Sequence, residues 1–123
     1  MNKILEEIGL YKIIPVIIID EVENSIPLAN ALIDGGLPVA EVTFRTKVAK
    51  ESIEKIANEF PKMLLGAGTV LFVDQVKSAI DAGAKFIIYP GLNSKVVEYC
   101  LTKNILVTPG IATPTEVGWL GTN

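Results

Sequence analysis

The segment VAEVTFRT at residues 39–46 decides the fold class of this chain. Its β-branched and apolar residues predict a strand over Val39–Phe44. Alternate side chains of a strand share a face, so Glu41, Thr43 and Arg45 point one way and the apolar residues between them point the other. Helices that cover the sheet pack on the apolar face. The polar face must therefore line either the interior of a closed, barrel-like sheet or its mouth, the opening at the carboxyl ends of its strands.

Short β-rich runs alternate along the chain with longer segments whose apolar residues recur every three or four positions. The predicted strands are Ile13–Ile19, Val39–Phe44, Met63–Ala67, Phe86–Tyr89 and Ile105–Thr108. The predicted helices cover Val22–Asp34 and the apolar stripes that run from Val48 to Phe60, from Val73 to Ile80 and from Val96 to Leu101. Pro27 is tolerated only near a first helical turn, so the first of these helices is expected to start as late as Ser25. The alternation predicts an α/β fold with a parallel sheet.

Composition excludes several classes of protein. The chain has 123 residues, of which 50% are hydrophobic, and no linker divides it, so we expect residues 1–123 to form a single globular domain or a piece of one. A net charge of −3 with no basic stripe argues against a nucleic-acid partner. The longest apolar run, Ile13–Ile19, is too short to span a bilayer, and acids follow the N-terminus where a signal peptide would be apolar. We therefore expect a cytoplasmic protein that does not bind membranes.

Histidine is absent, which removes the commonest general base and the commonest transition-metal ligand. No cysteine pair or acidic loop offers a metal cage, so neither a metal nor another cofactor is expected. The lone Cys100 is interpreted as a small buried apolar residue.

Glu41 and Arg45 are the candidate chemical groups of the second strand. Arg45 is the only arginine of the chain, and its planar fork suits a carboxylate or a phosphate. A partly desolvated Glu41 can hold a raised pKa and move protons near neutral pH. The alternative is a Glu41–Arg45 ion pair that only closes a layer of the sheet.

Three further strand ends carry turn or hydroxyl residues. Gly66-Ala67-Gly68-Thr69-Val70 ends the third strand, where glycines allow a ligand close to the backbone and Thr69 offers a hydroxyl. As a dinucleotide-binding motif this segment fails at its third glycine, because Leu71 stands there. Tyr89-Pro90-Gly91 and Thr108-Pro109-Gly110 form tight exits from the fourth and fifth strands. Tyr89 is interpreted as packing more readily than as a hydrogen-bond donor.

Five ordered motifs resemble the 2-keto-3-deoxy-6-phosphogluconate (KDPG)/4-hydroxy-2-oxoglutarate (KHG) aldolase family. They are Pro15-Val16-Ile17, EVTFRT at 41–46, GAGTV at 66–70, Pro90-Gly91-Leu92 and PGIATP at 109–114. The resemblance implies a (β/α)₈ TIM barrel, usually a homo-trimer, in which a lysine forms a Schiff base with a 2-keto acid and pyruvate is released. KDPG would give pyruvate and glyceraldehyde 3-phosphate, and KHG would give pyruvate and glyoxylate. By motif, Glu41 would be the catalytic proton shuttle, Arg45 would bind the substrate carboxylate, and Thr69 and Pro90 would contact the substrate.

Two features depart from the family. Tyr89 stands where the family commonly has a small hydroxyl residue. The family's Schiff-base lysine lies on the sixth strand, so we expect it beyond Asn123 and not among the ten lysines of this chain, of which only Lys47 follows a strand at the correct mouth. A helix start at Thr113-Pro114-Thr115-Glu116 is followed at once by Gly118 and Gly121, which suggests a truncated N-terminal portion with about five of the βα units.

Three hypotheses follow from the sequence. The first is an aldolase portion that is inactive alone or needs its other half in trans. The second is a non-catalytic module in which the open sheet pairs with a copy of itself. The third is a phosphosugar isomerase-like barrel that uses Glu41 as base and needs no lysine.

Overall fold

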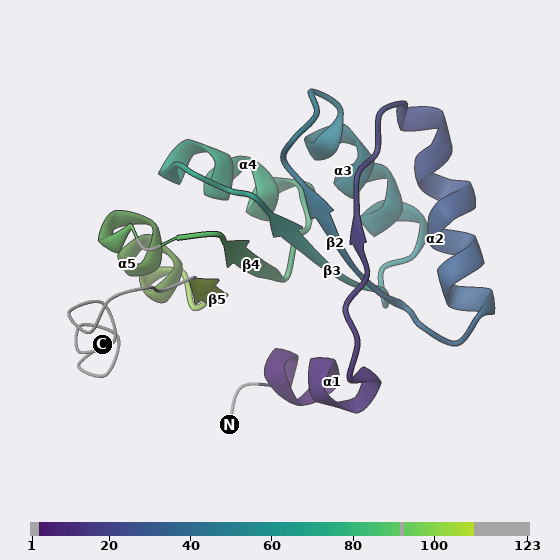
Figure 1. The fold of residues 1–123 in the computed structure, drawn as a ribbon, viewed down its shortest axis with the longest axis horizontal. Coiled ribbons are helices and arrows are strands. Elements are labelled where there is room, and N and C mark those ends of the chain that lie inside the picture. Colours follow the sequence, from purple (N-terminus) through teal and green to yellow (C-terminus); the bar gives the residue numbers. More distant parts are fainter. Residues whose placement is uncertain (1–2, 92, 110–123) are drawn as a thin grey trace.

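A computed structural model describes residues 3–91 and 93–109, in which five parallel strands alternate with helices. The strands are β1 (Val16–Ile17), β2 (Val39–Thr43), β3 (Leu64–Gly68), β4 (Phe86–Tyr89) and β5 (Leu106–Pro109). The helices are α1 (Lys3–Tyr11), η1 (Val22–Asn24), α2 (Ser25–Asp34), α3 (Ala49–Glu59), α4 (Val73–Ala82) and α5 (Ser94–Thr102). The strand order is β1-β2-β3-β4-β5, so each βα unit adds the next strand beside the last (Figure 1). The predicted parallel α/β fold is confirmed.

The strand β2 lies between β1 and β3 and carries Glu41. All five of its residues are buried, and it pairs with β3 from Val39 opposite Leu64 to Thr43 opposite Gly68. Because every strand is parallel, all carboxyl ends meet at one edge of the sheet, where the loops that follow β2, β3 and β4 gather.

The first strand is shorter than predicted. The sequence predicts Ile13–Ile19, whereas only Val16 and Ile17 pair with β2. Pro15 has no N–H to donate, although its carbonyl accepts a hydrogen bond from the Glu41 amide at 2.8 Å. Apolar side chains are exposed on this edge strand and just after it, among them Val16 at 59% and Ile18 at 50%.

Two cores pack on the two faces of the sheet. The larger core lies between the sheet and α2–α5 and includes Val42, Ala67 and Ile87. The smaller core consists of Val39, Leu64 and Phe86, against which α1 places Ile4, Ile8 and Tyr11. Figure 1 shows α2, α3 and α4 along one side of the sheet and α1 apart from them. We call the face of the smaller core the inner face.

Helix boundaries follow from capping chemistry. As predicted, α2 begins at Ser25, whose hydroxyl donates to the Val22 carbonyl at 2.7 Å and so joins η1 to the helix. After α2 and α4, Gly36 and Gly83 take the left-handed conformation, with φ of 82° and 114°. These glycines end each helix and turn the chain into the next strand.

Candidate active site

Glu41 is the buried carboxylate of the inner face. It is the third residue of β2 and is 6% exposed. A Cβ added at Gly68 would overlap Glu41 Oε2 and would lie 2.8 Å from Glu41 Cγ, so the carboxylate lies directly over the β3 backbone. Gly68 is the last residue of β3. The Glu41 side chain therefore leans from the middle of β2 toward the carboxyl edge of the sheet.

The two glycines of β3 make room for protein side chains. Just as Gly68 admits Glu41, Gly66 admits the ring of Phe86, which a Cβ at this position would overlap. In the described residues, the space beside these glycines is taken up by the Phe86 ring and the Glu41 carboxylate. Each of these two close approaches is a contact between neighbouring strands, which no local sequence pattern reports. The sequence signal for the Glu41 contact was the Gly-x-Gly pattern of the third strand, which pairs in parallel with the strand that carries Glu41 and leaves room for its side chain.

The surroundings of Glu41 favour its protonated form. Burial raises the pKa of the Glu41 carboxyl above its ordinary value of 4.5, and the positive charge of Arg45 opposes part of that shift. A carboxyl with a raised pKa can accept and return a proton at pH values closer to neutral. This is the property expected of a proton shuttle.

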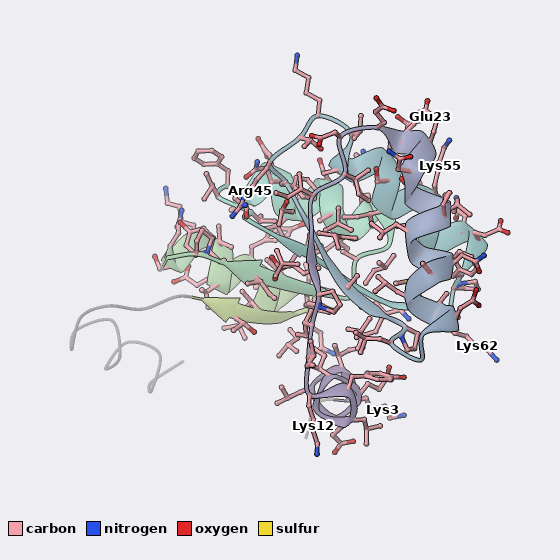
Figure 2. All side chains as sticks on the ribbon, turned by 45° about the vertical axis from the view of Figure 1, so that its right-hand side comes forward. Lys3, Lys12, Glu23, Arg45, Lys55 and Lys62 are labelled. Atoms are coloured by element: carbon pink, nitrogen blue, oxygen red, sulfur yellow. The ribbon has the colours of Figure 1, made fainter. Side chains whose placement is uncertain are left out.

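Arg45 lies beyond the end of β2. The sequence places Glu41 and Arg45 on one strand, but β2 ends at Thr43, and Arg45 is exposed in the turn that leads to α3 (Figure 2). The alternative of a buried Glu41–Arg45 ion pair with a purely structural role does not fit, because Arg45 is exposed. The guanidinium is instead available at the carboxyl edge.

Thr69 and Pro90 occupy the same edge on the next two strands. Thr69 directly follows β3, is half-buried and takes a left-handed φ of 54°. The turn after it is held by Gln75, whose Oε1 accepts hydrogen bonds from the amides of Leu71 at 2.7 Å and Phe72 at 3.1 Å. Pro90 directly follows β4 and is exposed. Gln75 was missed from the sequence, although a glutamine three residues after a helix N-cap is a recognised capping signal.

Tyr89 does not join the inner face. It is half-buried and packs against the larger core on the helical side of the sheet. The interpretation of this residue as packing is confirmed. The other Pro-Gly exit continues past Pro109, so the residues from Gly110 on, and the helix start predicted at Thr113, lie outside the described residues.

None of the ten lysines, all of which fall within the described ranges, is buried. Figure 2 shows Lys12 and Lys62 at the end of the molecule away from Arg45. Lys85 is half-buried and donates to the Pro61 carbonyl at 3.3 Å. Lys47, in the turn after β2, is exposed. The buried surroundings that activate an imine-forming lysine are therefore not provided by residues 3–91 and 93–109.

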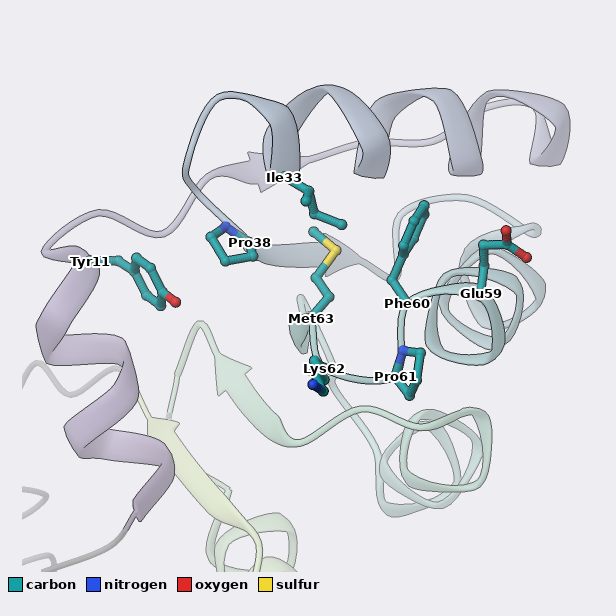
Figure 3. Close-up of a pocket in the computed structure, with 8 residues that line it drawn as sticks. All are labelled: Tyr11, Ile33, Pro38, Glu59, Phe60, Pro61, Lys62 and Met63. Atoms are coloured by element: carbon teal, nitrogen blue, oxygen red, sulfur yellow. The ribbon is translucent and has the colours of Figure 1, made fainter.

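A hollow of about 520 Å³ lies at the opposite, amino edge of the sheet. It opens between α1 and the ends of α2 and α3, and Met63 lies in its wall beside Phe60 (Figure 3). Its lining is mostly apolar, and it contains none of the residues placed at the carboxyl edge. The hollow is therefore separate from the candidate site.

Within the described ranges, no group of three or more Asp, Glu, Cys or His residues is placed to hold a metal ion. No helix described by the structure combines the length and the apolar character that a membrane span requires.

Comparisons with known proteins agree on one family. Residues 4–121 match the model of the KDPG and KHG aldolases. A 2-dehydro-3-deoxy-phosphogluconate aldolase of Treponema pallidum is 48% identical over 117 residues, which cover 95% of this chain and 56% of that protein. A KHG/KDPG aldolase of Escherichia coli is 41% identical over 105 residues, or 85% of this chain and 49% of that protein. The chain thus spans about half the length of the curated relatives it matches.

Two solved structures show the same arrangement. The KDPG aldolase of Legionella pneumophila, with pyruvate captured as a covalent carbinolamine intermediate, is 42% identical with a TM-score of 0.84, and the match covers 89% of this chain and 54% of that one. The KDPG aldolase of Zymomonas mobilis with 3-phosphoglycerate is 36% identical with a TM-score of 0.87, covering 99% and 57%. The five parallel βα units correspond to part of the barrel of these enzymes. The chain belongs to the KDPG and KHG aldolase family.

Proposed function

We propose that residues 1–123 carry the acid–base and carboxylate-binding part of a Schiff-base aldolase site that acts on 2-keto acids. The observation that carries the proposal is Glu41, a carboxyl that is 6% exposed and directed over Gly68 toward the carboxyl edge. Arg45, Thr69 and Pro90 follow three neighbouring strands at that edge. A buried acid beneath an exposed cation suits a small anionic substrate whose reaction requires proton transfer.

The proposed reaction assigns one role to each group. A lysine and the substrate carbonyl form an imine, which acts as an electron sink while the carbon–carbon bond breaks. Glu41 takes up and returns the protons of the carbinolamine and enamine steps. Arg45 binds the substrate carboxylate, while Thr69 and Pro90 contact the substrate. KDPG would yield pyruvate and glyceraldehyde 3-phosphate, and KHG would yield pyruvate and glyoxylate.

The nucleophilic lysine is proposed to lie outside residues 1–123, because none of the ten lysines is buried. We accordingly propose that residues 1–123 have no aldolase activity alone, or require the remaining barrel units in trans. The matched residues cover 56% of the Treponema pallidum relative and 49% of the Escherichia coli relative, which supports this proposal.

Borohydride trapping tests where the imine forms. The purified chain is incubated with pyruvate, reduced with borohydride and measured as an intact mass, while pyruvate release from KDPG is followed with a coupled dehydrogenase. We expect no stable adduct and no turnover from a chain that remains folded. An adduct that digestion maps to Lys47, with turnover, would show that residues 1–123 contain a complete site.

Self-association through the sheet edge is a second candidate role. The edge strand β1 exposes Val16, and Ile18 just after it and Ile13 before it are 50% and 63% exposed. A second copy that pairs with this edge would cover these side chains. Sedimentation equilibrium distinguishes such a dimer from the homo-trimer that the family resemblance implies. The cytoplasmic location stays a prediction.

A further inference from the structure

Thr46 connects the turn that carries Arg45 to Ile19, which lies two residues past the end of β1. Its Oγ1 donates a hydrogen bond to the Ile19 carbonyl at 2.6 Å. Ile19 is 2% exposed and belongs to the larger core. The hydroxyl is therefore bound to a backbone group that core packing holds in place.

This contact continues the pairing of two strands past the point where their backbone ladder ends. The β1–β2 register stops at Ile17 opposite Val42. Beyond it, Thr43 Oγ1 donates to the Ile17 carbonyl at 3.2 Å, and Thr46 Oγ1 donates to the carbonyl two residues further on. Arg45 lies between the two threonines. The two threonines that flank Arg45 in the sequence are therefore bound to carbonyls of the segment 17–19, although Arg45 itself is exposed.

We infer that Thr46 is a positioning residue for Arg45, and that its hydroxyl sets where the guanidinium stands at the carboxyl edge. The inference rests on the proposed function, in which Arg45 binds a 2-keto acid carboxylate. Bidentate binding of a carboxylate requires the planar fork at a defined position, and small displacements of a binding group lose affinity. An exposed arginine side chain has few packing contacts that could fix the position of its guanidinium. That position therefore depends on the backbone of the turn that carries Arg45.

Thr46 also has a structural part, because its carbonyl accepts the Ala49 amide at 3.5 Å at the start of α3. A loss of stability alone would therefore not separate the two roles. Side-chain variants that leave the backbone carbonyl in place are needed, together with a readout at Arg45.

The test compares Thr46→Val, which keeps the shape and removes the hydroxyl, with Thr46→Ser, which keeps the hydroxyl. Thr102→Val is the control, because Thr102 Oγ1 also donates to a backbone carbonyl, that of Tyr99 at 2.7 Å, but within its own helix α5 and not between two segments. Two quantities are measured on the full chain: the ¹⁵N relaxation of the Arg45 amide, and the Kd for pyruvate.

We expect Thr46→Val to increase the mobility of the Arg45 amide and to weaken pyruvate binding about tenfold, the effect of one ordinary hydrogen bond. Thr46→Ser should recover the wild-type values, and Thr102→Val should leave both unchanged. Pyruvate binding that is the same in Thr46→Val and wild type would overturn the inference. If the wild type binds no pyruvate, the proposed function fails, and unchanged Arg45 relaxation in Thr46→Val would then overturn the positioning role by itself.

Discussion

Replacing Gly68 with alanine perturbs the contact on which the placement of Glu41 depends. The new methyl group would overlap Glu41 Oε2 and lie 2.8 Å from Glu41 Cγ. The backbone itself accepts alanine, because among the described glycines only Gly36 and Gly83 have positive φ. The effect of Gly68→Ala therefore reports the Glu41 side chain and not backbone strain.

The size of the effect follows from two opposing contributions. Forcing an extra carbon into a packed site typically costs about 1–3 kcal/mol. Alanine in place of glycine restricts the unfolded chain and returns about 0.4–1 kcal/mol. We expect Gly68→Ala to lower the free energy of unfolding by about 1–2 kcal/mol.

Urea unfolding of a double-mutant cycle isolates the contact. The four proteins are wild type, Gly68→Ala, Glu41→Ala and the double variant. Once Glu41 is truncated, the methyl group at residue 68 has room, so its cost should disappear and the coupling free energy should be about 1–3 kcal/mol. Gly9→Ala is the control, because a Cβ there meets nothing within 4 Å in α1, and helix propensity should make it stabilising by about 0.5–1 kcal/mol. Additive effects at Gly68 and Glu41 would refute the placement of the carboxylate over β3.

Three further outcomes are expected. Because burial raises the pKa of Glu41, the native state loses stability as pH rises through that raised pKa. Glu41→Gln removes this titration. The free energy of unfolding of Glu41→Gln, measured with urea and compared with that of wild type, should therefore increase from pH 4 upward and then level off. Gly66→Ala should lower stability by about 3 kcal/mol, more than Gly68→Ala, because the new Cβ would overlap the ring of Phe86, a residue that is only 1% exposed; equal losses in the two urea midpoints would contradict this. Cys100 is fully buried and burial raises the pKa of its thiol to about 11, so a disulfide-exchange reagent should modify it only after unfolding; rapid modification of the native chain would contradict its placement.

The fold was predictable where local patterns determine it. Strands and helices alternate with distinct periods, and the capping glycines at Gly36 and Gly83 mark where helices end, so β2, β4 and the start of α2 at Ser25 were placed correctly. The parallel order then brings the carboxyl ends together, which is why residues 41, 45, 69 and 90 could be assigned to one edge without any coordinates.

Contacts between distant segments were not predictable in this way. The close approach of Glu41 to Gly68 depends on strand register, and the short pairing of β1 depends on Pro15 and an open edge. The helix α1 was missed, although Ile4, Ile8 and Tyr11 recur at the spacing of one helical face, because the core that they cover is formed by residues from three strands. Arg45 lies in a turn past the end of β2, where on the β1 side the threonine hydroxyls of residues 43 and 46 make the contacts, and periodicity does not report such bonds.

Titration of the ¹⁵N-labelled chain with pyruvate tests most directly whether the carboxyl edge is a 2-keto acid site. We expect saturable shifts of the Arg45, Gly68 and Thr69 amides, and binding about 10- to 100-fold weaker in Arg45→Gln, because hydrogen bonds to a charged group are lost. Shifts confined to the hollow around Met63 at the amino edge, or no saturable shift from a folded chain, would contradict the account.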